Sequence, residues 1–408
     1  MKKYITVILL LCLVAAKLNA ERQDSVQRKI IHVIGIDFKP AYTFPTKSFF
    51  RGDNLAQSPI RTNLSGHIKY GFKFGPDSYM GKMYPNTIQG IGIGYNTFNN
   101  TKEVGNPLAV YVFQTSRIAS LTKKLSLDYE WNFGASFGWK KYDEEKNPFN
   151  TIVGSKTNAY INLGLLLNWQ MTHEVALRAG IGLTHYSNGN TNYPNYGVNT
   201  LDGRIGLMWC PQDDPKSKFS NNDRVTVIPE QGFKPYVSYD LIVYGATKKK
   251  GIFWSDGSGI LIPGKFAVAG LNFNPMYNFN RFFRAGLSLD AQYDESANLT
   301  DHVANTNTPT DDVKFFRPPF IEQFSLGLSA RAEVVMPIFS INFGIGKNFV
   351  CRGADTNSFY QTFVLKTSIT ENVFLHVGYQ LYKFKDPNNL MIGIGYRFNA
   401  KFFFALNL

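Results

Sequence analysis

The stretch that decides the fold is LSLDYEWNFGASFGW, residues 125–139. Its odd-numbered positions are apolar or aromatic and read Leu125, Leu127, Tyr129, Trp131, Phe133, Ala135, Phe137 and Trp139. Its even-numbered positions are small or polar and read Ser126, Asp128, Glu130, Asn132, Gly134, Ser136 and Gly138. Because successive side chains of a β-strand point to opposite faces, this alternation predicts one long strand with an apolar face and a polar face.

The alternating segments are longer than the strands of typical soluble β-sheets. It is repeated in the segment 158–169, where the apolar positions are Ala159, Ile161, Leu163, Leu165, Leu167 and Trp169. Soluble β-sandwiches also alternate, but their strands have about 5–6 residues, and here the apolar faces are longer and end in Trp or Tyr, as membrane girdles do. Aromatic residues make up 15% of the chain and charged residues 18%, and there are 35 glycines. We therefore predict an all-β, antiparallel β-barrel of a bacterial outer membrane.

Residues 1–20 are predicted to be a cleaved secretory signal. Lys2 and Lys3 form a basic start, an apolar run covers residues 5–16, and Ala20 is a small residue at the expected cleavage point. The run is shorter than the ~20 apolar residues of a membrane-spanning helix, which disfavours the alternative of a single helical anchor. No later stretch is long and apolar enough for such a helix.

Turn-forming residues divide the rest of the chain into about sixteen strands. The expected spans are 29–44, 63–74, 88–98, 107–117, 123–141, 157–170, 174–187, 198–210, 233–246, 261–276, 280–293, 319–335, 338–348, 359–370, 373–384 and 389–399. Three connections are long and polar, namely 142–156, 247–260 and 294–318, and three are tight, near 171–173, 336–337 and 370–372. Long loops of such barrels face the outside and short turns face the periplasm, and all six connections fit one alternating orientation.

One connection interrupts this alternation. Residues 211–232 follow strand eight, where a short turn is expected, yet they form a long polar stretch. We therefore predict two eight-stranded units in tandem, residues 21–210 and 233–408, joined by a linker at 211–232. The start of strand seven, VALRAG at 175–180, has an echo in VFLHVG at 373–378. One wide barrel of 14–16 strands remains the alternative.

The net charge and the cysteine content indicate which binding partners and which disulfide bonds to expect. The net charge is +13, and loss of the three signal lysines leaves about +10, which in an exported protein suits anionic lipid or lipopolysaccharide. Nucleic acid is not expected, because the basic residues are scattered through loops instead of clustered on one element. No metal site is expected from the histidines, because they are dispersed and lack metal-ligand spacing, and the sequence leaves open whether Ca²⁺ assists. Cys210 and Cys351 could pair in an oxidising periplasm, although two unpaired residues at strand ends are favoured, and Lys248–Lys250 are expected in a solvated loop.

The clearest chemistry lies in THYSNGN, residues 184–190, followed by PNYGVN, residues 194–199. The apolar face of the first strand consists of Val175, Leu177, Ala179, Ile181 and Leu183, and His185 and Ser187 continue it. On the returning strand Asn199 is in phase with the apolar residues Leu201, Ile205, Leu207 and Trp209. Three polar side chains are thus predicted on the lipid-facing side, near the outer rim.

Polar side chains that face lipid are costly unless they serve a purpose. Same-face neighbours lie ~6.8 Å apart along a strand, so His185 can approach Ser187, and Asn199 can reach the other ring nitrogen. The alternative is that these residues lie in the headgroup layer or a loop, where polarity costs little. A nucleophile, a base and an orienting group in phase across one hairpin favour a catalytic site.

This hairpin resembles the active-site hairpin of the lipid A 3-O-deacylase (PagL) family, which includes acyloxyacyl hydrolases. The pattern His-x-Ser-Asn followed by Pro-Asn-x-Gly is matched by His185, Ser187, Asn188, Pro194, Asn195 and Gly197. The resemblance covers residues 29–210 and implies an eight-stranded barrel that hydrolyses an ester-linked acyl chain of lipid A without a cofactor. It implies that Ser187 is the nucleophile and His185 the general base, with Asn188 in support. It also implies that Asn195 and a backbone N–H near Gly189 or Asn190 hold the oxyanion.

The chain departs from the family at the third catalytic position. The family has a glutamate there, and Asn199 stands at the matching place. An amide can orient His185 but cannot balance the charge of an imidazolium ring, so weaker or altered activity is expected. Asp202 is the nearest acid, but its phase points it into the barrel.

The second unit is expected to lack the site. When residues 373–378 are aligned with residues 175–180, Lys383 and Lys385 occupy the places of His185 and Ser187. This indicates a structural unit or a surface that binds anionic lipid. The competing function for the whole chain is a non-catalytic barrel, a channel or a structural protein. A wide barrel with an open polar lumen would favour the channel, and two narrow, filled barrels would favour the enzyme. The acyl position that is cleaved and the oligomeric state stay open.

Overall fold

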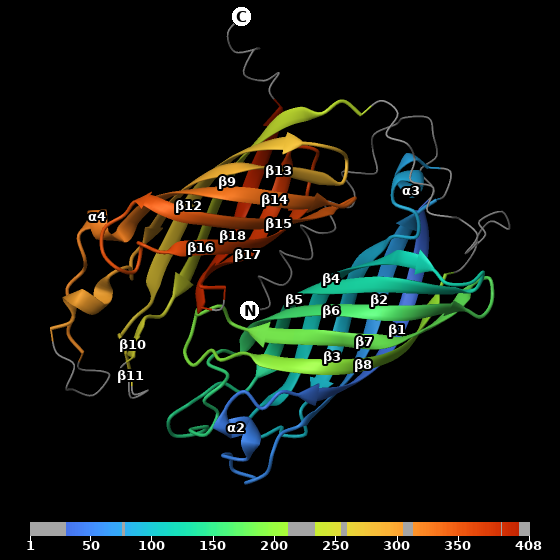
Figure 1. Cartoon of the computed structure of the whole chain (residues 1–408). Helices are drawn as coiled ribbons and strands as arrows, with labels where there is room; N and C mark the ends of the chain where they lie inside the picture. Colours follow the sequence, from blue (N-terminus) through green and yellow to red (C-terminus); the bar gives the residue numbers. More distant parts are fainter. Residues whose placement is uncertain are drawn as a thin grey trace, which may run out of the picture. The chain divides into compact units, whose positions relative to one another are not determined.

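The computed structural model describes residues 30–75, 78–210, 233–253, 259–304, 313–384 and 386–399. They form two compact units, called here barrel 1 (residues 30–210) and barrel 2 (residues 233–399) (Figure 1). The expected signal at 1–20 and the expected linker at 211–232 lie outside the described residues, so the domain boundaries stay predictions.

Barrel 1 is a closed antiparallel sheet of eight strands in chain order. Its strands are β1 (Ile30–Thr43), β2 (Thr62–Phe74), β3 (Ile88–Thr97), β4 (Gly105–Ser120), β5 (Leu125–Trp139), β6 (Thr157–Gln170), β7 (Val175–Ser187) and β8 (Val198–Trp209). Pairing of β1 with β8, from Ile34 opposite Trp209 to Thr43 opposite Thr200, closes the sheet and covers the hydrogen-bonding edges of both strands. Two short helices lie at opposite ends of the barrel, α2 (Ser48–Arg51) after β1 and α3 (Tyr79–Met83) after β2 (Figure 1).

Barrel 2 repeats this plan. Its eight strands are β9 (Tyr236–Lys248), β12 (Phe266–Asn278), β13 (Phe283–Asp294), β14 (Phe324–Val335), β15 (Phe339–Val350), β16 (Phe359–Ser368), β17 (Val373–Tyr382) and β18 (Asp386–Asn399). Antiparallel pairing of β18 with β9 closes it. Its connections hold a small hairpin of β10 (Gly251–Phe253) and β11 (Gly259–Leu261), the 3₁₀ helix η1 (Leu299–His302) and the helix α4 (Phe320–Gln323).

The structure confirms the two-barrel prediction, and the alternative of one wide barrel is wrong, because each set of eight strands closes on itself. The sequence missed the short elements within the connections, since none has the length or periodicity that marks an element in a sequence. The interpretation of Lys248–Lys250 as a solvated loop is wrong for Lys248, which is buried at the end of a strand. Lys248 is the last residue of β9 and donates to Asp294, and Lys250 forms an ion pair with Asp355.

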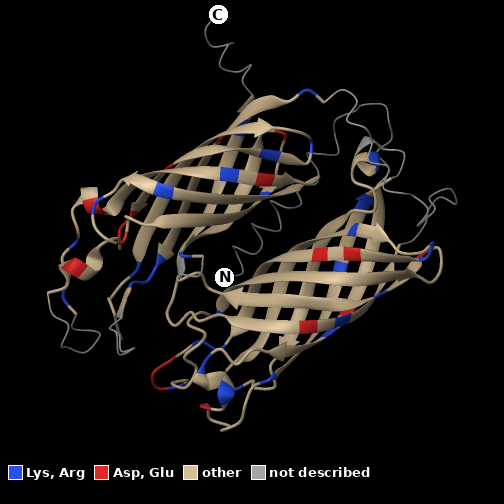
Figure 2. Cartoon of the chain, in the orientation of Figure 1, with Lys and Arg blue, Asp and Glu red and all other residues tan. Residues whose placement is uncertain are grey.

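The outer face of each barrel is apolar and the inner face is polar. On β7 the side chains of Ile181 and Leu183 are 62% and 56% exposed, whereas Thr184, in the opposite phase, is buried. Charged residues are sparse along the strands (Figure 2), and most of those on strands are buried. This inversion of a soluble protein's pattern fits a barrel whose outside faces hydrocarbon.

Buried ion pairs fill the lumen of barrel 1. The Glu130 carboxylate oxygens form ion pairs with side-chain nitrogens of Lys69 at 2.7 Å, Arg178 at 3.1 Å and Arg204 at 2.5 Å. All four side chains are almost completely buried. Barrel 2 has an equivalent cluster, in which Asp240 and Glu333 receive Lys366, Arg284 and Arg397. Each lumen is therefore a packed polar core.

None of the helices among the described residues is long and apolar enough to cross a membrane. Cys210, buried just after β8, and Cys351, half-buried after β15, are both free thiols. Both cysteines lie directly after a strand, as the sequence predicted, and because they belong to different barrels their pairing stays a prediction.

Candidate active site

The β7–β8 hairpin carries the three polar residues singled out in the sequence. Its register places His185 of β7 directly opposite Asn199 of β8. Ser187 is the last residue of β7 and lies opposite Ala159 of β6. All three polar side chains are half-buried and share the outward phase of Leu183. They therefore lie together at the end of the barrel that carries α2, called here the long-loop end.

His185 is held by Asn199. Its Nδ1 lies 2.7 Å from the Asn199 Oδ1. Because the amide oxygen can only accept, the imidazole carries its proton on Nδ1 and donates it. The lone pair of the neutral ring is then on Nε2, which is the arrangement of a general base.

Ser187 follows His185 by two residues on the same face of β7, so their Cα atoms lie about 6.8 Å apart. Among the described residues no hydrogen bond joins the Ser187 Oγ to the His185 Nε2. Such pairs are often long before substrate binds and shorten in the reacting complex. The side chain opposite Ser187 is only the methyl group of Ala159.

The loop between the two strands is ordered by its own asparagines. The Asn195 Oδ1 accepts from the backbone N–H of Asn188 at 3.0 Å, and the Asn195 Nδ2 donates to the Asn190 Oδ1 at 3.2 Å. Gly189 and Asn190 both have positive φ, 64° and 62°, so the chain turns sharply just after Ser187. These contacts bring together all the residues that the sequence assigned to an oxyanion hole. An amide nitrogen has two hydrogens, so Asn195 can donate a second time.

Gly197 explains the glycine of the motif. Its φ is +71°, and a Cβ added there would lie 2.9 Å from the His185 Cε1. A side chain at this position would therefore be strained and would press on the His185 ring. Within the same loop, burial and then a hydrogen bond to Tyr196 raise the pKa of Tyr193, so its phenol is neutral at physiological pH.

A buried network beneath the hairpin was not foreseen. The Asp202 Oδ1 accepts from Thr184 at 2.9 Å and from Asn162 at 3.0 Å, and Arg204 donates to the Asn162 Oδ1 at 2.8 Å. Asp202 thus points into the lumen, as its phase predicted, and braces β6, β7 and β8. Alternation in the sequence placed each of these residues inside, but their pairing depends on the register between strands.

Among the residues that the structure describes, the last hairpin of barrel 2 shows no equivalent of the His185 and Ser187 pair. β17 has 10 residues where β7 has 13, and it ends at Tyr382. Lys383 falls in the turn with φ of 53°, and Lys385 lies outside the described residues. Within the described residues, β17 therefore ends before the position that matches His185. Over the described part of the chain, no group of three or more His, Cys, Asp or Glu residues could hold a metal ion.

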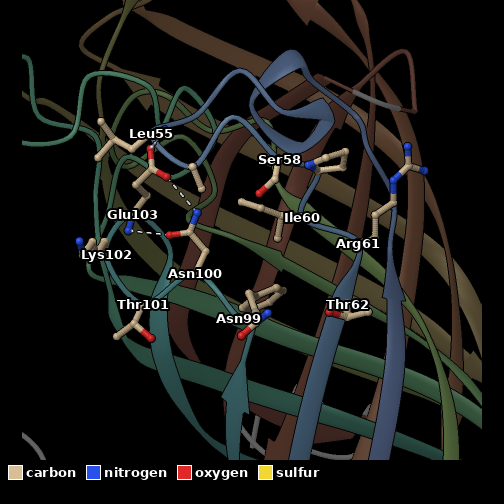
Figure 3. Close-up of a pocket in the computed structure, with 13 residues that line it drawn as sticks. Leu55, Ser58, Ile60, Arg61, Thr62, Asn99, Asn100, Thr101, Lys102 and Glu103 are labelled. Atoms are coloured by element: carbon tan, nitrogen blue, oxygen red, sulfur yellow. Dashed lines mark hydrogen bonds between the residues drawn. The ribbon is translucent and has the colours of Figure 1, made fainter.

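A cavity of about 320 Å³ lies at the long-loop end of barrel 1, and none of its lining residues belongs to the β7–β8 hairpin (Figure 3). It is lined by residues 55, 56 and 58–62, from the β1–β2 loop and the start of β2, and by residues 98–103 of the β3–β4 loop. The Glu103 carboxylate joins the two loops, because it accepts from the backbone N–H of Leu55 at 3.0 Å and from the Asn100 side chain at 2.9 Å. Arg61 is at one edge of this cavity.

Comparison with known proteins identifies both barrels. Residues 42–208 match the family described as lipid A 3-O-deacylase (PagL), and residues 237–400 match the family described as acyloxyacyl hydrolase, C-terminal domain. No curated protein sequence matches the chain.

Solved structures give only distant similarity. A triple mutant of the Rhodopseudomonas blastica porin shares 8% identity with a TM-score of 0.16, covering 91% of this chain and 100% of the porin. The siderophore receptor PirA from Pseudomonas aeruginosa shares 9% identity with a TM-score of 0.24, covering 91% of this chain and 81% of the receptor. These structural similarities are too low to assign a family. The family assignment rests on the two family matches, which together span both barrels. The chain therefore belongs to the lipid A 3-O-deacylase (PagL) family and carries that family's acyloxyacyl hydrolase C-terminal domain as its second barrel.

Proposed function

We propose that this protein hydrolyses an ester-linked acyl chain of lipid A in the outer membrane, with Ser187 as nucleophile and His185 as general base. The observation that carries the proposal is the 2.7 Å hydrogen bond from the His185 ring to Asn199. His185 lies two residues before Ser187 on the outward face of β7. A polar triad on a face that is otherwise apolar needs a function to offset its cost. Membership of a lipid A deacylase family supplies the substrate class.

The proposed reaction begins when the His185 Nε2 takes the proton of Ser187. The Ser187 Oγ attacks the ester carbonyl, and the tetrahedral oxyanion receives hydrogen bonds from the Asn195 Nδ2 and from a backbone N–H of Gly189 or Asn190. The sugar hydroxyl leaves with the proton held by His185, and an acyl-enzyme remains on Ser187. Water, deprotonated by His185, then attacks the acyl-enzyme and releases the fatty acid, and the proton returns to Ser187.

The position of the site suits a substrate held in a membrane. Lipid A has its acyl chains in the hydrocarbon and its sugars at the surface, so its ester bonds lie near the membrane interface. The triad lies at the long-loop end of the barrel, just beyond the apolar positions of Ile181 and Leu183. Long loops of such barrels face the outside, so the triad would meet lipid A of the outer leaflet directly from the lipid phase.

A channel is the less favoured function. Each barrel has only eight strands, and in barrels of this size side chains fill the interior. The Glu130 ion pairs occupy the lumen of barrel 1, and their four side chains are almost completely buried. Filled lumens favour the enzyme.

Substitution of the catalytic pair tests the proposal. Ser187→Ala and His185→Ala are each expected to lower acyl release by at least about 10³-fold, because members of a catalytic unit fail together. Lipid A from cells that express each variant is compared by mass spectrometry, and heat-modifiable migration shows that each barrel has folded. Ser120→Ala is the matched control, because Ser120 is an exposed serine at the end of β4 that is farthest from the long-loop end of barrel 1. Full deacylation by a folded Ser187→Ala protein would contradict the assignment.

A further inference from the structure

The loop after β1 lies directly beside the candidate active site. Thr43, at the end of β1, pairs with Thr200 of β8, and the backbone N–H of Phe44 donates to the Asn199 carbonyl at 2.9 Å. The chain therefore stays attached to the sheet up to the residue that orients His185. The β1–β2 loop, residues 44–61, starts from this point.

Three cations of this loop, Lys47, Arg51 and Arg61, are called here the rim cations. The Lys47 Nζ lies 3.8 Å from the centre of the Tyr196 ring. Tyr196 belongs to the 188–197 loop that follows Ser187, so this cation–π contact holds the ammonium group beside the site.

The two arginines are anchored on either side of Phe44. The Arg51 Nε donates to the Pro45 carbonyl at 3.2 Å, and the Arg61 Nη1 donates to the Tyr42 hydroxyl at 2.9 Å. These neutral partners use only part of each guanidinium, which has five N–H donors. The three positive groups therefore surround the junction of β1 and β8.

The rim cations differ from the cations of the lumen in their partners. Lys69 and Arg204 share the Glu130 carboxylate inside the barrel. Within the described residues none of the rim cations forms an ion pair, and the single acid of the loop, Asp53, accepts from the Ser48 hydroxyl. Arg51 and Arg61 are exposed and Lys47 is half-buried. Positive charge without a carboxylate, held at a membrane interface, attracts anionic headgroups.

We propose that Lys47, Arg51 and Arg61 form a subsite for a phosphate group on the sugar headgroup of the lipid substrate. This inference rests on the proposed deacylase function and deepens it, because it makes the headgroup phosphate a determinant of substrate choice. Neighbouring strands lie about 4.8 Å apart, so β1 is about 10 Å and β2 about 15 Å from β7, which carries Ser187. The long lysine and arginine side chains shorten this gap, and a disaccharide headgroup that carries both the ester and a phosphate bridges the rest.

The cavity beside Arg61 supports this placement. Figure 3 shows Arg61 at the edge of the group of residues that line it, with Ser58 and Ile60 nearby. Its volume of about 320 Å³ is at the lower end of the range for small-molecule pockets, ~300–1,000 Å³. Polar groups of the β3–β4 loop, including Asn100, form the opposite wall. The cavity thus offers room for a saccharide next to the phosphate that Arg61 would hold.

Binding to an inactive protein tests the subsite without depending on catalysis. The parent is the full chain with Ser187→Ala in detergent micelles, and its affinity for diphosphorylated lipid A is compared with that for enzymatically dephosphorylated lipid A. The combined variant Lys47→Ala, Arg51→Ala and Arg61→Ala is expected to bind the phosphorylated lipid at least about 30-fold more weakly, because charge-assisted hydrogen bonds to phosphate are strong. Its affinity for the dephosphorylated lipid should change less than about threefold. Lys123→Ala with Lys124→Ala, at the opposite end of barrel 1, is the matched control.

The possible outcomes separate the two proposals. Unchanged discrimination between the two lipids in the triple variant would overturn the subsite, even if the wild-type protein is an active deacylase. Loss of discrimination together with a wild-type protein that releases no acyl chain would support the subsite and refute the deacylase. Binding of inorganic phosphate alone to the Ser187→Ala protein, as tight as that of the phosphorylated lipid and lost in the triple variant, would show a site for free phosphate and overturn the lipid headgroup as its ligand. If the triple variant does not fold, Arg61→Ala is compared with Arg61→Lys, and only the alanine variant should lose discrimination.

Discussion

At the scale of single residues, the proposed chemistry depends on how the His185 ring is held. Asn199 accepts the Nδ1 proton, and Gly197 lies so close to the ring that it leaves no space for a side chain. These two contacts fix the tautomer and the plane of the imidazole. An amide orients the ring as a carboxylate would, but it supplies no negative charge when the ring becomes positive in the transition state.

Substitution of Asn199 tests this difference. Asn199→Glu is expected to raise the deacylation rate, because a carboxylate stabilises the imidazolium ion, and Asn199→Ala is expected to lower it by about 10–100-fold by removing the orienting hydrogen bond. Asp202→Asn should change the rate per folded molecule less than about threefold, because Asp202 contacts Thr184 and Asn162 inside the barrel. The rates are measured on purified lipid A. If Asp202→Asn abolishes the reaction and Asn199→Ala does not, the outward-facing site is wrong.

Substitution of Gly197 tests the fit of the ring. Gly197→Ala puts a methyl group 2.9 Å from the His185 Cε1 and forces an alanine to adopt φ of +71°, a conformation that costs about 1–3 kcal/mol. We expect at least a 10-fold loss of kcat with the barrel still folded. Gly203→Ala is the matched control on β8, because its added Cβ would meet only the Pro40 carbonyl, at 3.8 Å. Equal effects of the two substitutions on kcat would exclude a specific role for Gly197.

At the scale of strands, the rigidity of the site comes from the inside of the barrel. The Glu130 carboxylate on β5 joins Lys69 of β2, Arg178 of β7 and Arg204 of β8. Arg204 continues through Asn162 toward the strand positions directly beneath His185. A buried network of this kind holds its strands in one register, which supports a geometry that loops alone would not maintain.

Removal of the Glu130 charge tests the network. Glu130→Gln leaves three buried cations without their shared carboxylate, so we expect a loss of about 3–5 kcal/mol in the free energy of unfolding. Urea titration of the protein in detergent, followed by heat-modifiable migration, measures it. Glu145→Gln, an exposed residue of the β5–β6 loop, is the control and should leave the midpoint unchanged. Equal midpoints for the two variants would show that the network does not stabilise barrel 1.

At the scale of the whole molecule, each barrel contains its own closed sheet and its own buried charge cluster. In barrel 1 every strand finds its partners within the sheet of residues 30–209, and β1 closes on β8. A unit that satisfies its own backbone hydrogen bonds needs no partner to insert into a membrane.

Expression of residues 21–215 alone tests this independence. The fragment is expected to fold in detergent micelles, to show heat-modifiable migration, and to keep His185 and Ser187 in a functional hairpin. Residues 233–408 are the counterpart and should fold without acyl-releasing activity, because β17 stops before the positions that match the proposed catalytic pair, His185 and Ser187. A first fragment that never folds in detergent would show that the second barrel is required for assembly.

The sequence by itself determined the strands and their faces, because side-chain direction alternates along every strand and depends on nothing distant. For that reason the phase of His185, Ser187 and Asn199, and the inward direction of Asp202, could be predicted from residues 175–209 alone. The turn between the strands could also be read locally, since Gly189, Asn190 and Gly197 suit positive φ. Other features depend on which strands are neighbours, which is set only when the sheet closes. The grouping of Glu130 with three distant cations, the attachment of Phe44 to Asn199 and the gathering of the rim cations beside the hairpin all follow from closure of β1 onto β8. Closure is a property of eight strands together, and so the tertiary structure alone decided between one wide barrel and two narrow ones.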